Sequence, residues 1–374
     1  MIIYTNNISL NISYKQLIYD CFLKNNKLYL VCPIYDNIID ISNLYISFNN
    51  TNLILNNRLT KNDRHKIDIL IYDCNYDNGN LLIQYNDIKK EIYLSNIITK
   101  INKKLSLTTL FKDDYKLFTI FYPYYKKQKV EHFYLYYNGL INNDVKQYFN
   151  KYNDVTLIEW NFKYWHLNKH HAQIAQINHS LYLFGKNRTK YMIYCDFDEY
   201  LFVPLIKLYD FITDHDIYIF SNNWAETINN KIPTKFPIKF KISDKVTNKN
   251  RNKNIFNIKS ISLLCIHYPF LYSIENPNEN KNNIMFHFYK WSGKNRIFDT
   301  KYFYTTNYIK ITNSFNKILN GNYIYDYIYN IFRKNNNKIL RKNNKWLISI
   351  NNSNKYIKLI NLINKDKNIK FQLL

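Results

Sequence analysis

An apolar run in the middle of the chain, Tyr191–Cys195, leads directly into the acidic residues Asp196, Asp198 and Glu199. A run without polar alternation is typical of a strand buried on both faces, as in the centre of a parallel sheet. Because side chains alternate along a strand, we expect Asp196 and Asp198 to point the same way where this strand ends. The carboxyl ends of such strands are where open α/β sheets bind ligands.

The segments before this run predict an α/β order. Apolar stretches at 105–110, 130–137 and 155–160 have the length and composition of strands, and residues 170–184 predict an amphipathic helix. A short helical stretch after the first strand is expected to stop at Pro123. This alternation of strands and helices is typical of a mixed, mainly parallel sheet flanked by helices.

The pattern divides the chain into three regions. Residues 1–103 have short apolar runs separated by Asn and Asp clusters, and they predict a β-rich accessory domain, a small sandwich or half-barrel. Residues 104–300 contain the α/β pattern and the acidic block, and they form the predicted main domain, which carries the candidate chemistry. Residues 301–374 form an extension rich in Lys, Asn, Ile and Tyr, to which the sequence assigns no role.

Glycine and cysteine usage excludes several common kinds of site. Only five glycines occur among the 374 residues, and they form neither a G-x-G-x-x-G dinucleotide loop nor a G-x-x-x-x-G-K-[ST] phosphate loop. The five cysteines are scattered and never form a C-x-x-C pair, so they indicate neither a zinc site nor a disulfide framework. Any nucleotide must therefore be held by other means.

The sequence also bears on location. No apolar run reaches about 18 residues, so no transmembrane segment is predicted. The N-terminus, M-I-I-Y-T-N-N, lacks the basic start and long apolar stretch of a secretory signal. Scattered, unpaired cysteines fit a reducing compartment. We therefore expect a soluble, cytoplasmic protein.

The formal net charge of +24 raises the question of a nucleic-acid partner. Clustered Lys and Arg neutralise phosphates and release counterions. However, abundant Lys, Asn, Ile, Tyr and Phe together are what an A/T-rich coding sequence produces whatever the function. Attraction to an anionic nucleotide or glycan fits the charge equally well, so nucleic acid is a minor interpretation.

The acids Asp196 and Asp198 are the chemical signal around which a function can be built. Two carboxylates side by side at the edge of a low-dielectric core raise one another's pKa unless a positive charge lies between them. A divalent cation meets this need, and oxygen ligands favour Mg²⁺ or Mn²⁺ over zinc. The alternative is a solvated acidic turn after a core strand.

Several short motifs accompany the acidic block in a fixed order over residues 105–292. They are Lys112-Asp113-Asp114 after a strand, His132–Asn138 as a second strand, Gln173 at the start of a helix, Asp196–Tyr200, Lys259-Ser260-Ile261, Ile266–Pro269, and His287-Phe288-Tyr289. In order and spacing they resemble glycosyltransferase family 92, whose members use nucleotide sugars and have the GT-A fold. One departure is Tyr137, which stands where that family has an aspartate before Asn138.

The resemblance implies a metal-dependent glycosyltransferase of the hexosyltransferase type. The donor it implies is a UDP-sugar, with galactose as the leading sugar, and the acceptor a glycan or glycoprotein. It further implies inversion at the transferred sugar. Donor contacts are then expected from residues at the matching positions, Lys112, Asp114, Asn138, Gln173 and Asp196.

The resemblance also suggests a ligand set for Mn²⁺ or Mg²⁺. Asp198 is the first choice for direct ligation, with Asp196 contacting the metal or the ribose. A late histidine completes the metal site in many GT-A enzymes, and His287 is the best match by position. The alternative for His287 is a core histidine bonded to a backbone carbonyl, and His267 is a second, more structural choice.

An inverting transferase needs a base to accept the proton of the acceptor hydroxyl, usually Asp or Glu. Glu226 is one candidate, because it lies between the acidic block and the late histidines. Glu199 is the other, although holding the D-x-D loop suits it better. Trp224, Trp291 and Tyr289 are candidates for stacking on a sugar, but with 18% aromatic residues a place in the core is the alternative.

Two other classes of function remain open from the sequence. A basic nucleic-acid-binding protein with structural acids predicts salt-sensitive binding and no nucleotide-sugar turnover. A D-x-D enzyme that acts on phosphate esters predicts phosphate transfer or hydrolysis without a sugar.

Overall fold

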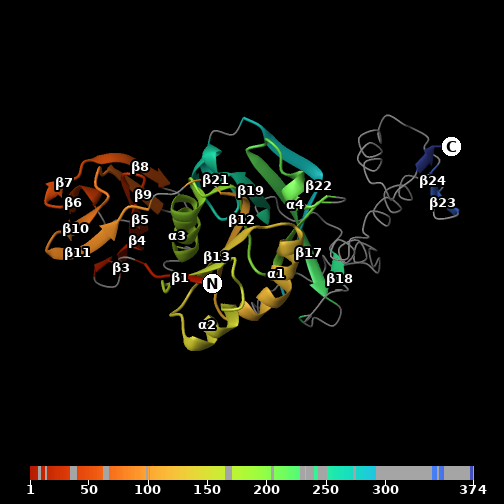
Figure 1. Cartoon of the computed structure of the whole chain (residues 1–374), viewed down its shortest axis with the longest axis horizontal. Helices are drawn as coiled ribbons and strands as arrows, with labels where there is room; N and C mark the ends of the chain where they lie inside the picture. The colour runs from red at the N-terminus through yellow and green to blue at the C-terminus, as the bar shows by residue number, and fades with distance from the viewer. Residues whose placement is uncertain are drawn as a thin grey trace.

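The computed structural model describes residues 1–6, 10–12, 15–33, 40–61, 67–97, 100, 102–164, 171–203, 206–227, 232, 240–242, 251–272 and 275–291, and three short strands at 339–342, 345–348 and 371–373. Within these residues the chain folds into one large sheet, several helices and a group of N-terminal antiparallel sheets (Figure 1).

The largest element is a ten-stranded mixed sheet. Its strands are β1 (Ile2–Tyr4), β12 (Lys103–Phe111), β13 (His132–Tyr137), β14 (Val155–Glu159), β15 (Thr189–Tyr194), β16 (Glu199–Phe202), β17 (Ile217–Thr227), β18 (Phe240–Ile242), β19 (Lys253–Asn257) and β22 (Pro277–His287). Their order is β1-β14-β13-β12-β15-β19-β17-β22-β16, with β18 beside β17. The first five strands of this order run parallel to one another, and β19 is antiparallel to both of its neighbours. The predicted mixed, mainly parallel sheet is confirmed.

The central strands of this sheet are buried on both faces. Along β15, Tyr191 and Ile193 belong to one hydrophobic core, while Met192 and Tyr194 belong to a second core on the other face. Residues of the helices α1 (Phe118–Lys127) and α2 (Asn143–Phe149) lie in the first core, and residues of α3 (His171–His179) lie in the second. The unbroken apolar run of the sequence therefore forms a strand that is buried on both faces, as predicted.

Helix α1 does not stop at Pro123, in contrast to the prediction. It continues to Lys127. Proline removes one backbone donor and disfavours the helix, but tertiary packing can outweigh that cost. Here Phe121, Tyr124 and Tyr125 are fully buried on both sides of the proline, so the core holds the helix together.

Two four-stranded antiparallel sheets make up most of the N-terminal region, which confirms its predicted β-rich character. Their orders are β4-β5-β9-β8 and β11-β10-β6-β7, and a shared core packs between them. The strands are β4 (Asp20–Lys24), β5 (Lys27–Pro33), β6 (Leu44–Phe48), β7 (Thr51–Asn52), β8 (Leu55–Lys61), β9 (Ile67–Asp73), β10 (Asn78–Tyr85) and β11 (Ile88–Ser95), with a separate pair β2 (Leu10–Ile12) and β3 (Lys15–Ile18).

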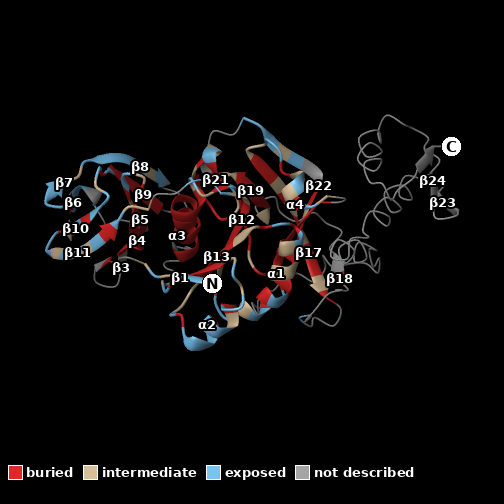
Figure 2. Ribbon diagram, in the orientation of Figure 1, coloured by how far each residue is buried: buried red, intermediate tan, exposed pale blue. Residues whose placement is uncertain are grey.

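Helix α3 lies between the N-terminal sheets and the large sheet, and it is buried along its length (Figures 1 and 2). It contacts β5 and β9 on one side and β12 on the other. His179 Nε2 lies 2.9 Å from Asp20 Oδ2, and Lys24 Nζ donates to backbone carbonyls at the end of the π-helix Ser180–Gly185 that continues α3. Buried polar contacts thus join the N-terminal sheets to the helix that covers the large sheet.

The other described elements are short. They are α4 (Leu208–Phe211), β20 (Ile261–Leu264), β21 (Pro269–Tyr272), β23 (Ile339–Lys342), β24 (Lys345–Ile348), β25 (Phe371–Leu373) and the 3-10 turns Ile41–Asn43, Tyr115–Leu117 and Ile258–Ser260. Among the described residues, no helix has both the length and the apolar character needed to cross a membrane.

Candidate active site

The acidic block forms the turn between β15 and β16. Because β15 ends at Tyr194, Asp196 and Asp198 follow the strand, whereas the sequence predicted that they extend its alternation. The turn closes through the Glu199 N–H, which donates to the Asp196 carbonyl at 3.0 Å. Phe197, between the two acids, is buried in the aromatic core and anchors the turn there.

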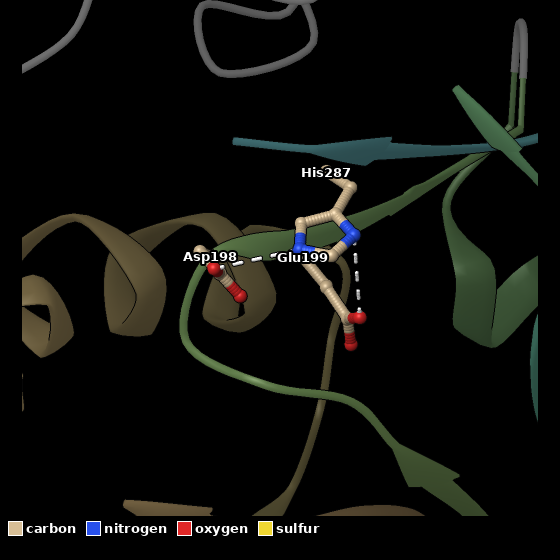
Figure 3. A group of neighbouring side chains, drawn as sticks. All are labelled: Asp198, Glu199 and His287. Atoms are coloured by element: carbon tan, nitrogen blue, oxygen red, sulfur yellow. Dashed lines mark ion pairs between the residues drawn. The ribbon is translucent and has the colours of Figure 1, made fainter. Parts of the chain in front are cut away.

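Asp198, Glu199 and His287 form a compact buried group (Figure 3). His287 Nε2 lies 3.5 Å from Asp198 Oδ2, and His287 Nδ1 lies 3.7 Å from Glu199 Oε1. Each of the three side chains is at most 5% exposed. The two carboxylates therefore face different nitrogens of one imidazole, as Figure 3 shows.

Strand pairing brings this group together. Glu199 begins β16 and lies directly opposite His287, the last residue of β22. On the other side of β22, Trp224 of β17 pairs with His287, and the two rings lie 4.5 Å apart. The imidazole is thus held by its strand and by the indole.

The chemistry of the group fits a metal ion. Its ligand atoms all lie within 4.8 Å of one another. Two ligand atoms that are each about 2.1 Å from one ion are themselves about 3 to 4 Å apart, which matches the separation of His287 Nε2 and Asp198 Oδ2. Among the described residues, buried His287 Nδ1 has no hydrogen-bond partner, so a core histidine bonded to a backbone carbonyl does not describe it.

Asp196 lies beside this group. Its Oδ2 is 3.6 Å from Lys253 Nζ, and its Oδ1 is 3.5 Å from the Gln173 amide nitrogen. Its backbone N–H donates to Glu199 Oε2 at 2.7 Å. With a side chain that is 33% exposed, Asp196 is the more open of the two aspartates. The predicted ligand set was Asp196, Asp198 and His287, whereas the compact group contains Glu199 in place of Asp196.

Lys253 is a residue of this site that sequence reasoning missed. Its Nζ lies 3.0 Å from Glu199 Oε2, and its side chain is 3% exposed. Burial alone would lower the pKa of Lys253, but Asp196 and Glu199 outweigh burial and raise it. In the sequence, Lys253 stands in a run of Lys and Asn without a motif. Only the pairing of β19 with β15, in which Asn254 lies opposite Tyr194, brings it here.

Asp114 is electrostatically coupled to the acidic turn. It follows β12, the parallel neighbour of β15. Burial raises the pKa of Asp114 to about 6; the N–H of Lys112 opposes this shift, and the charges of Asp198 and Asp196 add to it. The Lys112 side chain itself is exposed.

The other two predicted donor contacts have different surroundings. The Asn138 amide donates to two backbone carbonyls of the loop after β14, at 2.9 and 2.8 Å, so it holds that loop. Gln173, near the start of α3, accepts a hydrogen bond from the Tyr164 hydroxyl at 2.8 Å and turns its amide nitrogen toward Asp196. Of these two residues, only Gln173 contacts the acidic turn through its side chain.

Glu226 lies on β17 two residues after Trp224, and it is 17% exposed. Its Oε1 accepts a hydrogen bond from the Tyr289 hydroxyl and lies 2.8 Å from Lys290 Nζ. The Trp224 ring, which packs on His287, also lies 5.4 Å from the Tyr289 ring. Glu226 is thus held next to the aromatic residues that border the buried group.

The aromatic residues considered for sugar stacking are buried. Trp224, Tyr289 and Trp291 are 5%, 3% and 3% exposed. Trp291 stacks on Phe288 with the ring centroids 4.1 Å apart and belongs to the core. In this conformation the three rings offer little surface to an acceptor, so the structure favours the core alternative.

His267, the second histidine considered, lies outside the group of three. Its Nδ1 is 3.3 Å from the Asn252 carbonyl. Burial lowers the pKa of His267 to about 3, and the nearby charge of Lys253 adds to this shift. This imidazole is neutral at neutral pH and is held by the backbone.

The strand ends of a mixed α/β sheet thus carry a buried acid and histidine group that can hold a metal ion. The profile described as Glycosyltransferase family 92 matches residues 105–325, more than half of the chain. The chain belongs to glycosyltransferase family 92. It is therefore a glycosyltransferase, which uses a sugar donor and an acceptor, and the predicted family resemblance is confirmed.

Other comparisons add little. No curated protein sequence matches the chain. Among solved structures, the amylomaltase of Corynebacterium glutamicum shows a likeness with 9% sequence identity and a TM-score of 0.15, over 34% of this chain and 22% of that protein. The chain thus spans less than a quarter of that protein's length, and a TM-score this low supports no inference about fold or activity.

Proposed function

We propose that this glycosyltransferase moves a hexose from a UDP-sugar to a hydroxyl of a glycan or glycoprotein, with inversion and with the help of a divalent cation. The observation that carries the proposal is the buried group of Asp198, Glu199 and His287, inside the region matched by the family. Lys253 already balances the charge of Glu199, whereas buried Asp198 faces the imidazole. A buried carboxylate is costly without a positive charge, and a divalent cation beside Asp198 would supply one.

Asp198 and His287 are the proposed ligands, because their facing atoms have the separation of two atoms bound to one ion. Glu199 faces the other nitrogen of the imidazole and orients the ring, as carboxylates behind metal-bound histidines do. One nitrogen ligand beside oxygen ligands favours Mn²⁺ over Mg²⁺. When bound, the ion supplies a Lewis acid that stabilises the negative charge of the departing diphosphate.

The donor is proposed to lie along the ends of β12 and β15. Asp196, the more exposed acid, and Gln173, whose amide nitrogen faces it, are suited to bind the ribose hydroxyls. Asp114, on which the charges of Asp198 and Asp196 act, and the exposed Lys112, whose N–H donates to Asp114, are suited to contact the base or the phosphates. Asn138 supports this edge by holding the loop after β14.

Glu226 is the proposed base. In the reaction the acceptor oxygen forms a bond to the anomeric carbon, the bond from that carbon to the diphosphate oxygen breaks, and the bonding electrons leave with UDP. The proton of the acceptor hydroxyl passes to the Glu226 carboxylate. Tyr289 and Lys290 hold this carboxylate in place, whereas Glu199 is occupied by Asp196 and Lys253.

The deciding experiment measures UDP release from a panel of UDP-sugars, UDP-galactose included, with and without Mn²⁺. We expect Mn²⁺-dependent release from at least one donor and a loss of about 100-fold or more in Asp198→Ala. Asp210→Ala is the matched control, because Asp210 is a surface acid paired with Lys129. Equal rates in wild type and Asp198→Ala, or no release from any donor, would refute the proposal.

The expected cytoplasmic location stays a prediction. It is supported by the five cysteines, which are buried and form no disulfide. Fractionation of cells that express the full chain, with the protein followed by an antibody, tests it.

A further inference from the structure

Lys253 is a buried charged residue at the centre of the site. It begins β19, and its Nζ lies 3.0 Å from Glu199 Oε2 and 3.6 Å from Asp196 Oδ2. A buried ammonium group is stable only when it is paired. Because β19 is paired on both sides, with β15 and β17, the strand has little freedom to withdraw this side chain.

The lysine fixes the direction of the Glu199 carboxylate. Oε2 of Glu199 accepts the N–H of Asp196 and faces the Lys253 ammonium. This arrangement leaves Oε1 facing His287 Nδ1 at 3.7 Å. Lys253 therefore links both ends of the acidic turn and determines which oxygen of Glu199 meets the histidine.

The lysine also sets the charge of the site. Three carboxylates lie within contact distance of Lys253 or His287, namely Asp196, Asp198 and Glu199. The ammonium group of Lys253 cancels one of their three negative charges. Two negative charges remain, which is what a single divalent cation would balance. Without Lys253, Glu199 would lose its counter-charge and would compete with Asp198 for the ion.

We propose that Lys253 is a positioning residue for sugar transfer, which holds Glu199 and Asp196 away from the ion so that Asp198 and His287 bind it. This inference rests on the metal-dependent transfer proposed above. The lysine acts through the acidic turn, and the step it would support is the departure of the diphosphate from the transferred sugar, whose growing negative charge a bound cation would stabilise.

The test compares Lys253→Met with wild type in the full chain. Methionine keeps the apolar stem and removes the charge. We expect a lower melting temperature without metal and a larger rise on addition of Mn²⁺ than in wild type, because the ion replaces the missing charge. At saturating Mn²⁺ and donor, kcat should fall about 10- to 100-fold while the donor KM changes less. Lys129→Met, which breaks the surface pair with Asp210, is the control for removal of a lysine charge.

The double variant Lys253→Met/Glu199→Gln separates charge from packing. It restores the charge balance, so its metal-free melting temperature should lie closer to wild type and its Mn²⁺-induced rise should return to the wild-type size. If Lys253→Met does not fold without metal, the proposal is tested on the double variant alone, by its metal-free melting temperature and its Mn²⁺-induced rise. A double variant that stays as unstable as the single variant, or a single variant with wild-type kcat and a wild-type Mn²⁺ response, overturns the inference.

The inference and the proposed function fail in different ways. Absence of Mn²⁺-dependent UDP release by the wild-type protein refutes the proposed function. Normal Mn²⁺-dependent release by wild type together with unchanged behaviour of Lys253→Met refutes only the role of the lysine.

Discussion

Glu199 and His287 lie directly opposite each other at one end of the antiparallel pair β16 and β22. The facing atoms, Glu199 Oε1 and His287 Nδ1, are 3.7 Å apart. This separation is longer than a hydrogen bond, so Glu199 faces this nitrogen without bonding to it, while Nε2 of the same ring faces Asp198. Residues far apart in the sequence thereby become the two sides of one site.

Replacement of His287 should weaken metal binding without unfolding the protein. In His287→Ala, we expect the affinity for Mn²⁺ to fall about 100-fold or more, because one of two proposed ligands is lost. Titration calorimetry, or the electron paramagnetic resonance signal of free Mn²⁺, measures this affinity directly. His215→Ala is the control, since His215 binds Asn276 away from the site. Equal affinity in wild type and His287→Ala would remove the histidine from the ligand set.

Replacement of the proposed base should lower kcat and leave the affinity for Mn²⁺ unchanged. In Glu226→Gln, kcat should fall about 10²- to 10⁴-fold, because glutamine cannot accept the acceptor proton. Its side-chain oxygen can still accept the Tyr289 hydroxyl, so we expect the Mn²⁺ affinity and the melting temperature to stay close to wild type. Steady-state kinetics with saturating donor give the answer, and a kcat near wild type would assign the base to another residue.

Lys24 should be important for stability although it lies in the N-terminal sheets. Its Nζ donates to backbone carbonyls at the end of the π-helix, and its side chain is 1% exposed. Burial lowers the pKa of Lys24 to about 7, and the amine can donate in either protonation state. Lys24→Met leaves buried carbonyls without a donor, so the free energy of unfolding should fall by about 3 kcal/mol.

The matched control for Lys24 lies directly opposite in the same hairpin. Lys27 pairs with Lys24 across β4 and β5, but its side chain is 47% exposed and its ion pair with Asp73 is at the surface. Lys27→Met should change the free energy of unfolding by less than about 0.5 kcal/mol. Urea denaturation followed by circular dichroism compares both variants. If both variants lose a similar free energy of unfolding, the carbonyl contacts of Lys24 do not stabilise the fold more than the surface contacts of Lys27 do.

His132 should make stability depend on pH. Burial lowers the pKa of His132 to about 4, whereas an unfolded histidine has a pKa of about 6.5. As the pH falls, the unfolded chain therefore takes up a proton before the folded protein does. The stability contribution is fully present above about pH 6.5 and is lost as the pH falls toward about 4.

The size of this effect can be measured against a variant. Between about pH 8 and pH 5, the contribution of His132 to the free energy of unfolding should fall by about 1 to 2 kcal/mol. Solvent reduces the effect, because the ring is partly exposed. His132→Gln can retain the hydrogen bond to Thr156 and does not titrate. Denaturation curves at the two pH values should differ less for the variant. A wild type and a variant with the same pH dependence would contradict the assignment to His132.

Much of the site was predictable because its acids follow a strand with an unmistakable local pattern. The run Tyr191–Cys195 predicted a central strand, and Asp198 and His287 were expected to meet at one site; the structure has both in one buried group. The end of the strand was less predictable, since Asp196 and Asp198 lie in a turn anchored by Phe197. The helix through Pro123 was also missed, because core packing outweighed the local preference of proline.

By itself, the sequence determined the kinds of elements, the α/β order and the residues with metal-binding chemistry. These are local properties, because a strand buried on both faces or an acid after it can be recognised from neighbouring residues. Only the tertiary structure decided that Lys253 joins the acidic turn and that Glu199 lies opposite His287. Their positions depend on the order and register of β19 and β22 in the sheet, and strand pairing is a long-range choice that no single stretch of residues encodes.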